Sequence, residues 1–357
     1  MTLRTTFTTF IFLIFFGPNS FGEKNPINSN QGIRKNYKEF KDHHLQDNHS
    51  FKLFKYKSKE KVKYVSFSLP VILWDNGLQI FSSKKFYHGK KIAEHKGNFY
   101  KLYHSKIYKT DKKGTITYNR ENKVSNQKPL DFSITKNVVF ILTGMFLMIF
   151  VFVRMAKSYK NNLIPLGFGR LMEPIILYIR DDIARPNIGE KHYKRYMSFL
   201  LTVFFFIWFV NLFGLTPLGS NVTNNIAVTA SLSLLTYIIT TFTANKNYWA
   251  HIFWMPGVPT PMKLLLAPIE LLGTIIKPFS LMIRLYANMT AGHVVLMSII
   301  GLIFIFQNWI GGTLSFGLAF ALALLELLVC ALQAYIFTML SALYFGAAVE
   351  DHHHEEH

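Results

Sequence analysis

The sequence is short of cysteine, of acidic residues and of nucleotide-binding motifs. Its one cysteine, Cys330, excludes an internal disulfide framework and a zinc site built from cysteine alone. It has 20 Asp and Glu residues against 39 Lys and Arg, which gives a formal net charge of +19. No G-x-x-x-x-G-K-[ST] segment is present, so any ATP chemistry of that kind is expected on other chains.

Apolar residues, by contrast, are abundant. Half of the 357 residues are hydrophobic and 34 of them are Phe. A disordered or nucleic-acid-binding chain this basic would not carry so much apolar mass. A soluble enzyme would not hold its apolar residues in long uncharged runs. The composition therefore predicts an all-α polytopic membrane protein with no nucleic-acid partner.

The charge is concentrated near the N-terminus. Residues 23–130 hold 24 Lys and Arg against nine Asp and Glu, whereas residues 131–357 hold 14 against 11. We therefore expect a basic extension at 23–130, a channel-like apolar body at 131–350 and an acidic, His-rich tail at 351–357. Alternation at 64–74 and 99–108 predicts short strands in the extension. A basic stretch of this kind is a spacer or small accessory domain, or a surface that binds anionic lipid or polymer.

The first 22 residues predict a secretory signal. Arg4 supplies the positive start, residues 7–16 form a short apolar run, and Ser20 and Gly22 place small residues at the cleavage-determining positions. The apolar run is shorter than the ~20 residues that a membrane span requires, which favours cleavage over an uncleaved anchor. In either case the extension is expected outside the cytoplasm.

Five apolar segments follow the extension, at about 138–153, 199–216, 226–243, 264–305 and 314–349. They predict about five transmembrane helices. The last two are longer than a span needs, which fits either strong tilt or a break between them such as Gly311-Gly312. We interpret them as a long, tilted helical hairpin.

Charges in the connections between these segments give an orientation. The connection at 154–195 holds nine Lys and Arg, the turns at 217–225 and 306–313 hold none, and the turn at 244–263 holds two. Basic connections stay in the cytoplasm, so the C-terminus is expected inside and the N-terminus outside. The basic extension is long enough to be translocated despite its charge.

A surface helix is expected at 167–185, between the first two spans. Its apolar residues follow the i, i+3, i+4, i+7 rule and are Phe168, Leu171, Met172, Ile175, Ile176, Ile179 and Ile183. Its charged residues are Arg170, Glu173, Arg180, Asp181 and Asp182. We expect this amphipathic helix on the cytoplasmic membrane surface or against a partner, with Pro186 ending it.

Residues 278–349 contain only three Arg, Lys, His, Asp or Glu side chains, and these are Arg284, His293 and Glu326. A charge inside a span is costly and normally marks an ion pathway. Arg284 stays charged at any physiological pH, so it is expected to act as a fixed electrostatic gate and not as a proton relay. The alternative is an arginine that extends to a lipid headgroup.

Helical spacing places further polar residues beside these three. Asn288 shares a face with Arg284, and His293 lies about 13 Å further along the helix. Glu326 and Gln333 share a face of the returning helix, about 10 Å apart. If Arg284 and Gln333 lie at one depth, His293 and Glu326 meet at a second, outer depth. Such a pair exchanges protons near neutral pH, unless it is purely structural.

Two other groups of polar residues are candidates for aqueous paths. Glu270 lies 14 residues before Arg284, about 21 Å toward the cytoplasm, where it opens a water path or is an ordinary helix-terminal acid. Polar residues around the 217–225 turn line an outer mouth or cap helices, and they are Asn211, Asn221, Asn224, Asn225 and Thr229. The channel-lining candidates among them are Asn211 and Asn225.

The stretch PFSLMIRLYANMTAGH at 278–293 closely resembles the signature of subunit a of F-type ATP synthases. The stretch ALQAYIFT at 331–338 and two stretches, 179–184 and 199–217, also resemble that family. The resemblance covers about 131–357. The family places Glu and His at two outer-pathway positions in either order, and here these positions hold His293 and Glu326. Family members often end in a Glu-Glu-His-like tail, which favours a solvated tail over a metal site.

The resemblance implies a non-catalytic stator subunit of a rotary proton channel. Its partners would be a rotor c-ring, the peripheral-stalk subunit b, the rest of the ATP synthase and membrane lipid. The transported ion would be H+, no cofactor would be needed, and the location would be a bacterial inner membrane. Protons would pass His293, Glu326, Asn288 and Gln333 on one side of Arg284 and leave past Glu270 on the other.

Two other functions fit parts of the sequence. A stand-alone ion-coupled transporter would show an internal inverted repeat with broken helices, and no convincing repeat is present. A membrane-anchored basic surface-binding protein would make residues 23–130 the functional part.

Overall fold

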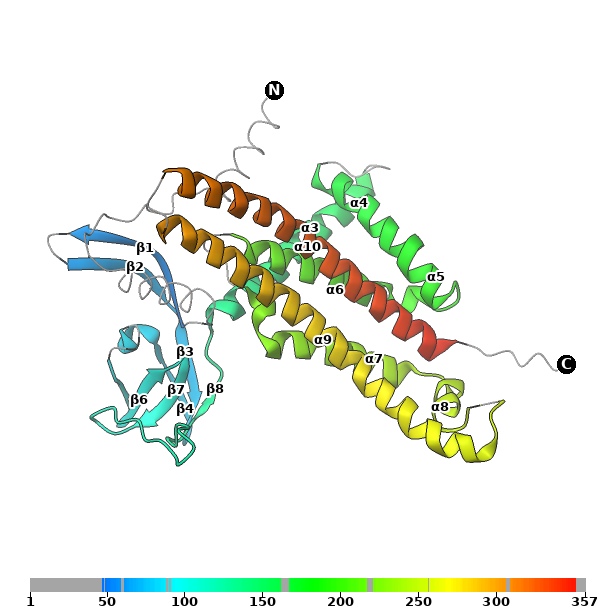
Figure 1. Ribbon diagram of the computed structural model, residues 1–357, viewed down its shortest axis with the longest axis horizontal. Coiled ribbons are helices and arrows are strands. Elements are labelled where there is room, and N and C mark those ends of the chain that lie inside the picture. The colour runs from blue at the N-terminus through cyan, green and yellow to red at the C-terminus, as the bar shows by residue number, and fades with distance from the viewer. Residues whose placement is uncertain are drawn as a thin grey trace, which may run out of the picture. The chain divides into compact units, whose positions relative to one another are not determined.

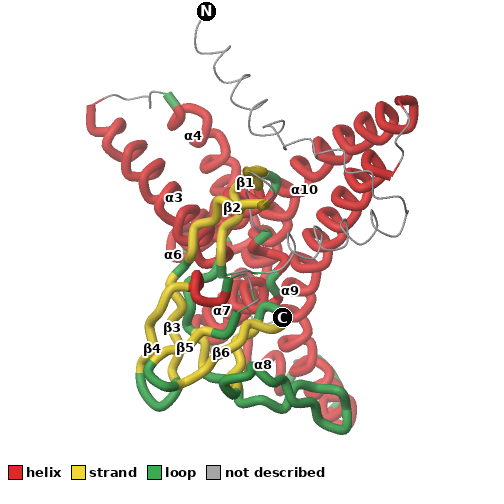
Figure 2. Tube along the Cα trace, turned by 90° about the vertical axis from the view of Figure 1, so that its left-hand side faces the viewer, coloured by secondary structure: helices red, strands yellow, loops and turns green. Residues whose placement is uncertain are grey.

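The computed structural model describes residues 47, 49–58, 61–87, 89, 91–161, 167–216, 221–255, 257–305 and 309–350. The predicted signal at 1–22 and the tail at 351–357 lie outside these residues. The chain divides into two compact units, Met1–Leu142 with Thr216–Ser220 and Thr143–Leu215 with Asn221–His357. Figure 2 distinguishes the strands (yellow) from the helices (red), and among the described residues every strand precedes the first long helix in the sequence.

The first unit is built from antiparallel strands (Figure 1). Strands β1 (Ser50–Ser58) and β2 (Lys61–Ser68) form a two-stranded ribbon. One three-stranded sheet has the order β4-β3-β8, with β3 at Pro70–Trp74, β4 at Leu78–Ser82 and β8 at Leu130–Asp131. The other has the order β5-β6-β7, with β5 at Ala93–His95, β6 at Asn98–Tyr103 and β7 at Lys106–Thr110. The strands expected at 64–74 and 99–108 are confirmed.

Alternating residues of these strands form the core of the first unit. A short 3₁₀ helix, η1 (Ser83–Phe86), adds Phe86 to the cluster. The buried hydrophobic residues are Val71, Leu73, Phe81, Phe86, Ala93, Tyr100 and Ile107.

A buried polar contact crosses this core from one sheet to the other. Tyr100 donates a hydrogen bond to Asp75 Oδ2 at 2.9 Å, and Lys109 Nζ lies 2.8 Å from the same oxygen. Burial acts to raise the pKa of the Asp75 carboxyl, but the hydrogen bonds from Lys109 and Tyr100 outweigh it and hold that pKa below its usual range. Asp75 begins the β3–β4 turn, and Asn76 and Gly77 take the positive φ values of 49° and 120° that this turn requires.

Among the described residues, five helices are long and apolar enough to cross a membrane, as the apolar segments predict. They are α3 (Lys136–Asn161), α6 (Tyr193–Gly214), α7 (Ile226–Thr243), α9 (Thr260–Ile305) and α10 (Trp309–Val349). Shorter elements connect them: α4 (Phe168–Tyr178), a π-helical turn η2 (Ile179–Ala184), α5 (Arg185–Ile188), the 3₁₀ turn η3 (Val222–Asn224) and α8 (Lys246–Phe253).

Helices α9 and α10 form the predicted long hairpin and run side by side (Figure 1). They contain 46 and 41 residues, so each is far longer than the ~20 residues of a minimal span. The alternative of a break at Gly311-Gly312 is wrong, because both glycines lie inside α10. A helix tolerates glycine at a cost of only about 1 kcal/mol, and apolar helix-forming neighbours on both sides outweigh that cost.

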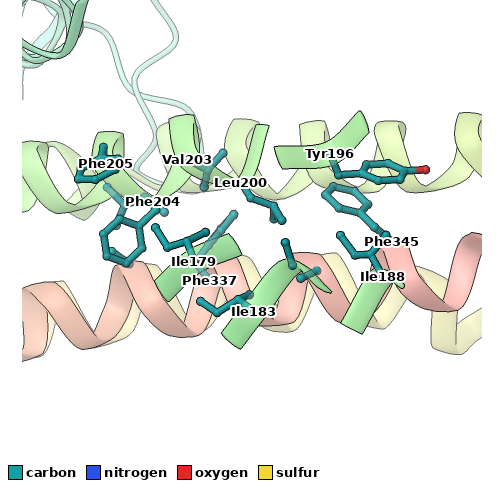
Figure 3. Close-up of a cluster of buried hydrophobic side chains, with 14 of the residues drawn as sticks. Ile179, Ile183, Ile188, Tyr196, Leu200, Val203, Phe204, Phe205, Phe337 and Phe345 are labelled. Carbon is teal, nitrogen blue, oxygen red and sulfur yellow. The ribbon is translucent and has the colours of Figure 1, made fainter. Parts of the chain in front are cut away.

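The core of the second unit joins α6, α10 and the connecting helical run α4–η2–α5 (Figure 3). Tyr196 of α6 stacks on Phe345 of α10 with ring centroids 4.5 Å apart. Ile179 and Ile183 of η2 are fully buried between these helices. The apolar face of the expected amphipathic helix therefore packs largely against the chain's own α6 and α10.

The predicted end of that helix at Pro186 is wrong. The helical run continues to Ile188 and stops at Gly189, whose φ is 86°. The Arg185 N–H bonds five residues back to the Arg180 carbonyl, which closes a π-helical turn. Pro186 then occupies the start of a new α-helical turn, where its missing N–H removes no helical hydrogen bond.

Candidate functional site

The predicted polar residues of the last two spans meet across the α9–α10 hairpin, inside the second unit. Helix α9 carries Arg284, Asn288 and His293, and α10 carries Glu326 and Gln333. Both segments are apolar between these positions, which keeps them helical within a membrane and turns the polar side chains toward the neighbouring helix. The result is two polar contacts at different heights of one helix pair.

The first contact joins the two amide side chains. Asn288 Nδ2 donates to Gln333 Oε1 at 2.9 Å, and Gln333 is buried. The sequence predicts amide neighbours for Arg284 if Gln333 lies at its depth, and the hydrogen bond joins Gln333 to Asn288, one helical turn after Arg284. This bond ties the two helices together close to the arginine.

The second contact joins His293 and Glu326, as the spacing predicts. His293 Nε2 lies 3.4 Å from Glu326 Oε1, and the two side chains are only 4% and 5% exposed. Neither carboxylate oxygen of Glu326 has a hydrogen-bond partner among the described residues. Gly292 makes room for this carboxylate, because a Cβ at that position would lie 3.0 Å from Glu326 Oε1. The pair is a buried, titratable site shielded from water.

Arg284 differs from this pair in its surroundings. Its side chain is half-buried, and among the described residues it has no hydrogen-bond or ion-pair partner. Its neighbours Leu281 and Leu285 are buried, while Ile283 is 42% exposed. Arg284 therefore lies at the margin between the packed and the open face of α9, where its charge has no counter-charge inside the described chain.

Glu270 lies in the interior of α9, ten residues after that helix begins at Thr260, so the reading of a helix-terminal acid is wrong. It is half-buried. Along α9, a small cavity lies between Glu270 and Arg284, since Thr274, Lys277 and Leu281 all line it.

This cavity carries a set of hydroxyl groups that the sequence reasoning missed. They come from α7, α8, α9 and α10 and belong to Ser233, Thr236, Tyr237, Thr240, Tyr248, Thr274 and Tyr344. A signal for it was present in the sequence, because Ser233, Thr236 and Thr240 are spaced three and four residues apart and so share one face of α7. A polar stripe on an otherwise apolar span indicates a hydrated or hydrogen-bonded interior face.

The polar residues of the 217–225 turn have two different roles in the fold. Asn225 is the N-cap of α7 and accepts a hydrogen bond from the Ala227 N–H at 3.0 Å, which is the helix-capping alternative. Asn211 is buried at the end of α6 and accepts from Thr223 Oγ1 at 2.8 Å.

Two neighbouring asparagines connect this turn to α9 instead. Asn221 Nδ2 donates to the Met289 carbonyl at 3.3 Å, and Asn224 accepts a hydrogen bond from Thr290 Oγ1. Both contacts lie within one turn of His293, so the turn and the His293–Glu326 pair form one polar region of the second unit.

Residues 138–346 match the family model described as ATP synthase A chain. Residues 40–132 match a second model, described as Domain of unknown function (DUF8433). The match to the first model includes every residue of the two polar contacts, together with Arg284 and Glu270.

Several curated relatives are similar to nearly two thirds of the chain. "ATP synthase subunit a" of Chloroherpeton thalassium is 42% identical over 237 residues, which is 64% of this chain and 70% of the relative. "ATP synthase subunit a" of Myxococcus xanthus is 42% identical over 236 residues, 64% of this chain and 77% of the relative. The protein of the same name from Chlorobium phaeobacteroides is 42% identical over 234 residues, 63% of this chain and 68% of the relative. The chain is thus a multi-pass membrane protein that belongs to the ATP synthase A chain family.

Proposed function

We propose that this chain is the proton-conducting stator subunit of a rotary F-type ATP synthase. It forms two half-channels against a rotor c-ring and couples proton translocation to rotation, with Arg284 separating the half-channels. The single observation that carries this proposal is the arrangement of Arg284. It is a permanent cation on the open margin of a membrane helix, with no counter-charge in the described chain, one turn from a polar helix-helix contact.

The outer half-channel runs past His293–Glu326 and then Asn288–Gln333. A histidine and a carboxylate 3.4 Å apart exchange a proton readily, because each ionisation changes the stability of the other. The amide pair next to them offers both donors and acceptors, so it supports a water or proton passing toward the rotor in either direction. The asparagines of the 217–225 turn extend this polar region toward its mouth.

The inner half-channel runs from the rotor past the hydroxyl-lined cavity to Glu270. Hydroxyl groups act as both donor and acceptor, so those that line this small cavity, beside Lys277, offer hydrogen bonds to a water molecule on the proton's path. Glu270 follows this cavity along α9 and supplies a carboxylate on the proton's way out.

Arg284 works by attraction and by exclusion. A rotor carboxylate that has lost its proton is costly in lipid, so it stays near the stator until it is protonated again. At 4 Å from a guanidinium, such a carboxylate would be attracted by about 4 kcal/mol at an effective dielectric constant near 20. The same fixed charge repels a proton that would otherwise pass straight between the half-channels.

The partners follow from this mechanism. The chain would contact the c-ring through the open face of α9 and α10, and the peripheral-stalk subunit b and lipid elsewhere. It takes no part in nucleotide chemistry and needs no cofactor. We place it in a bacterial inner membrane, with the extension outside the cytoplasm and the C-terminus inside.

Replacing the arginine tests the proposal. In inverted membrane vesicles, Arg284→Ala should abolish ATP-driven acidification, while ATP hydrolysis by the detached catalytic subunits continues. The control is Ile149→Ala, which removes an exposed side chain from α3, outside the proposed rotor contact, and should leave pumping near the wild-type rate. Normal acidification by Arg284→Ala would contradict the gating role.

Purification separates this function from the stand-alone transporter. Co-isolation with a small hydrophobic ring-forming protein is expected for a stator subunit. A purified chain that transports ions by itself, without other polypeptides, would overturn the proposal.

A further inference from the structure

The sheet β4-β3-β8 of the first unit is apolar on both faces. Its inner face supplies Val71, Leu73 and Phe81 to the buried core. Antiparallel sheets that face water on one side normally alternate apolar residues inside with polar residues outside. This sheet does not.

The outer face carries five exposed large hydrophobic side chains. Their exposed fractions are 55% for Trp74, 49% for Leu78, 52% for Ile80, 63% for Leu130 and 64% for Phe132. In the pairing of the strands, Trp74 lies opposite both Leu78 and Leu130. Directly opposed residues share a face of the sheet, so these side chains lie side by side. Phe132 joins them, since its N–H bonds to the carbonyl of Ile72, the residue opposite Ile80. We call these five residues the outer apolar patch.

A contiguous apolar patch rimmed by polar residues marks an interaction surface. Two observations indicate what this patch contacts. The first is the short connection to the membrane: β8 ends at Asp131, and the first membrane-spanning helix begins at Lys136. Five residues reach at most about 17 Å, so the sheet cannot leave the neighbourhood of the bilayer surface.

The second observation is charge. Residues 61–131 hold 15 Lys and Arg against five Asp and Glu. Lys128, which is exposed, lies two residues before Leu130. Lysines near a bilayer are attracted to anionic headgroups, and Trp is enriched where a protein meets the interface between lipid and water. Apolar side chains inserted at this depth combine with that attraction in peripheral membrane binding.

From this we infer that the outer apolar patch of β4-β3-β8 docks on the surface of a bilayer containing anionic lipid. The extension is then a membrane-seated domain whose sheet lies against the headgroup region beside its own membrane span. This inference does not depend on the proposed proton channel, because it uses only the first unit and the position of the first span.

Site-directed spin labelling of the full chain tests this inference. Cys330 is the only cysteine, so a Cys330→Ala background allows single labels to be placed at will. Ile80→Cys and Leu130→Cys report on the patch, and Lys106→Cys and Glu121→Cys are matched controls on exposed positions elsewhere in the unit. Each variant is reconstituted in nanodiscs with anionic lipid, and its collisions with oxygen and with a water-soluble nickel chelate are measured.

Labels on the patch should collide with oxygen more often than with the nickel chelate. Their collisions with the nickel chelate should be several-fold less frequent than those of the control labels. Nickel collisions as frequent as at the controls would show that the patch faces water and would overturn the inference. Protection from both oxygen and nickel would show that protein covers the patch, which would overturn it equally.

A second experiment keeps the label at Ile80 and removes other side chains of the patch. Trp74→Ser with Phe132→Ser should raise nickel collisions at the Ile80 label several-fold, because two of the anchoring side chains are gone. Tyr118→Ser removes an exposed aromatic residue outside the patch and should leave them unchanged. Equal collisions in all three proteins would contradict docking through the patch.

Discussion

Gly292 gives a direct test of whether the geometry of the His293–Glu326 pair matters. In Gly292→Ala, the added Cβ would lie 3.0 Å from Glu326 Oε1, whereas ordinary contact begins at 3.4 Å. The carboxylate must therefore retreat by about 0.4 Å, the difference between those two distances, or the helices must separate by that amount. Either movement changes a contact that is 3.4 Å in the native chain.

The same helix offers a matched control. Gly273 also lies within α9, and a Cβ added there would meet no atom within 4 Å. Both substitutions gain up to about 1 kcal/mol of helix propensity. Overpacking in Gly292→Ala opposes that gain by about 1–3 kcal/mol, so it should be less stable than Gly273→Ala.

Proton pumping and thermal unfolding of the two variants should therefore differ. We expect ATP-driven acidification by Gly292→Ala to fall several-fold below that of Gly273→Ala, which should match the wild type. The assay is quenching of a pH-sensitive dye in inverted vesicles that contain equal amounts of assembled complex. Equal acidification by the two variants would refute the reasoning that the pair must keep its native distance.

Three further predictions test single contacts. Asn288→Leu and Gln333→Leu should show a coupling free energy of about 0.5–2 kcal/mol in a double-mutant cycle followed by unfolding, and additive effects would contradict the 2.9 Å hydrogen bond. Asp75→Asn should destabilise the first unit by about 1.5–3 kcal/mol, measured by hydrogen exchange of the β6 and β7 amides. Because the pKa of Asp75 is lowered, its contribution is complete above the usual carboxyl range and is lost as the pH falls through the lowered value. Phe345→Ala should cost about 3–5 kcal/mol and lower the melting temperature of the assembled chain, since it removes a fully buried ring stacked on Tyr196.

The number of membrane spans and the contact between His293 and Glu326 were predictable because both depend on regular helices. A helix rises by a fixed distance per residue, so the spacing of polar residues along α9 and α10 sets which of them meet. Glu326 and Gln333, seven residues apart, both contact α9 as their spacing predicts, because no irregularity interrupts α10 between them.

Contacts that depend on side-chain direction were less predictable. The sequence predicts amide side chains near Arg284 without assigning a bond among them, and in the structure Gln333 accepts a hydrogen bond from Asn288. Amides satisfy each other's donors and acceptors inside an apolar bundle, while a guanidinium has only donors. Spacing along α9 does not decide whether Arg284 or Asn288 contacts Gln333, since both lie on the same face of that helix.

Irregular backbone was the least predictable part of the fold. Pro186 normally indicates a helix end, but a π-helical turn before it moves it to the start of a new turn. Gly311 and Gly312 normally indicate a break, but they lie within α10. The hydroxyl-lined cavity was missed for a different reason: the stripe on α7 is visible in the sequence, but the residues of α8, α9 and α10 that complete the cavity come together only in the fold.

Helix α9 carries Arg284 and, nine residues later, His293 of the His293–Glu326 pair. These two sites differ in whether their charge can be balanced within the chain. His293 and Glu326 are buried against each other, and each changes charge by gaining or losing a proton, so this pair can remain balanced within the chain. Arg284 has no such freedom, because its charge is permanent. With no counter-charge among the described residues, its charge would be stabilised by an anion at the open margin of α9. In the function proposed above, the rotor carboxylate would therefore approach Arg284 and not the buried pair, which would be left to load and unload protons.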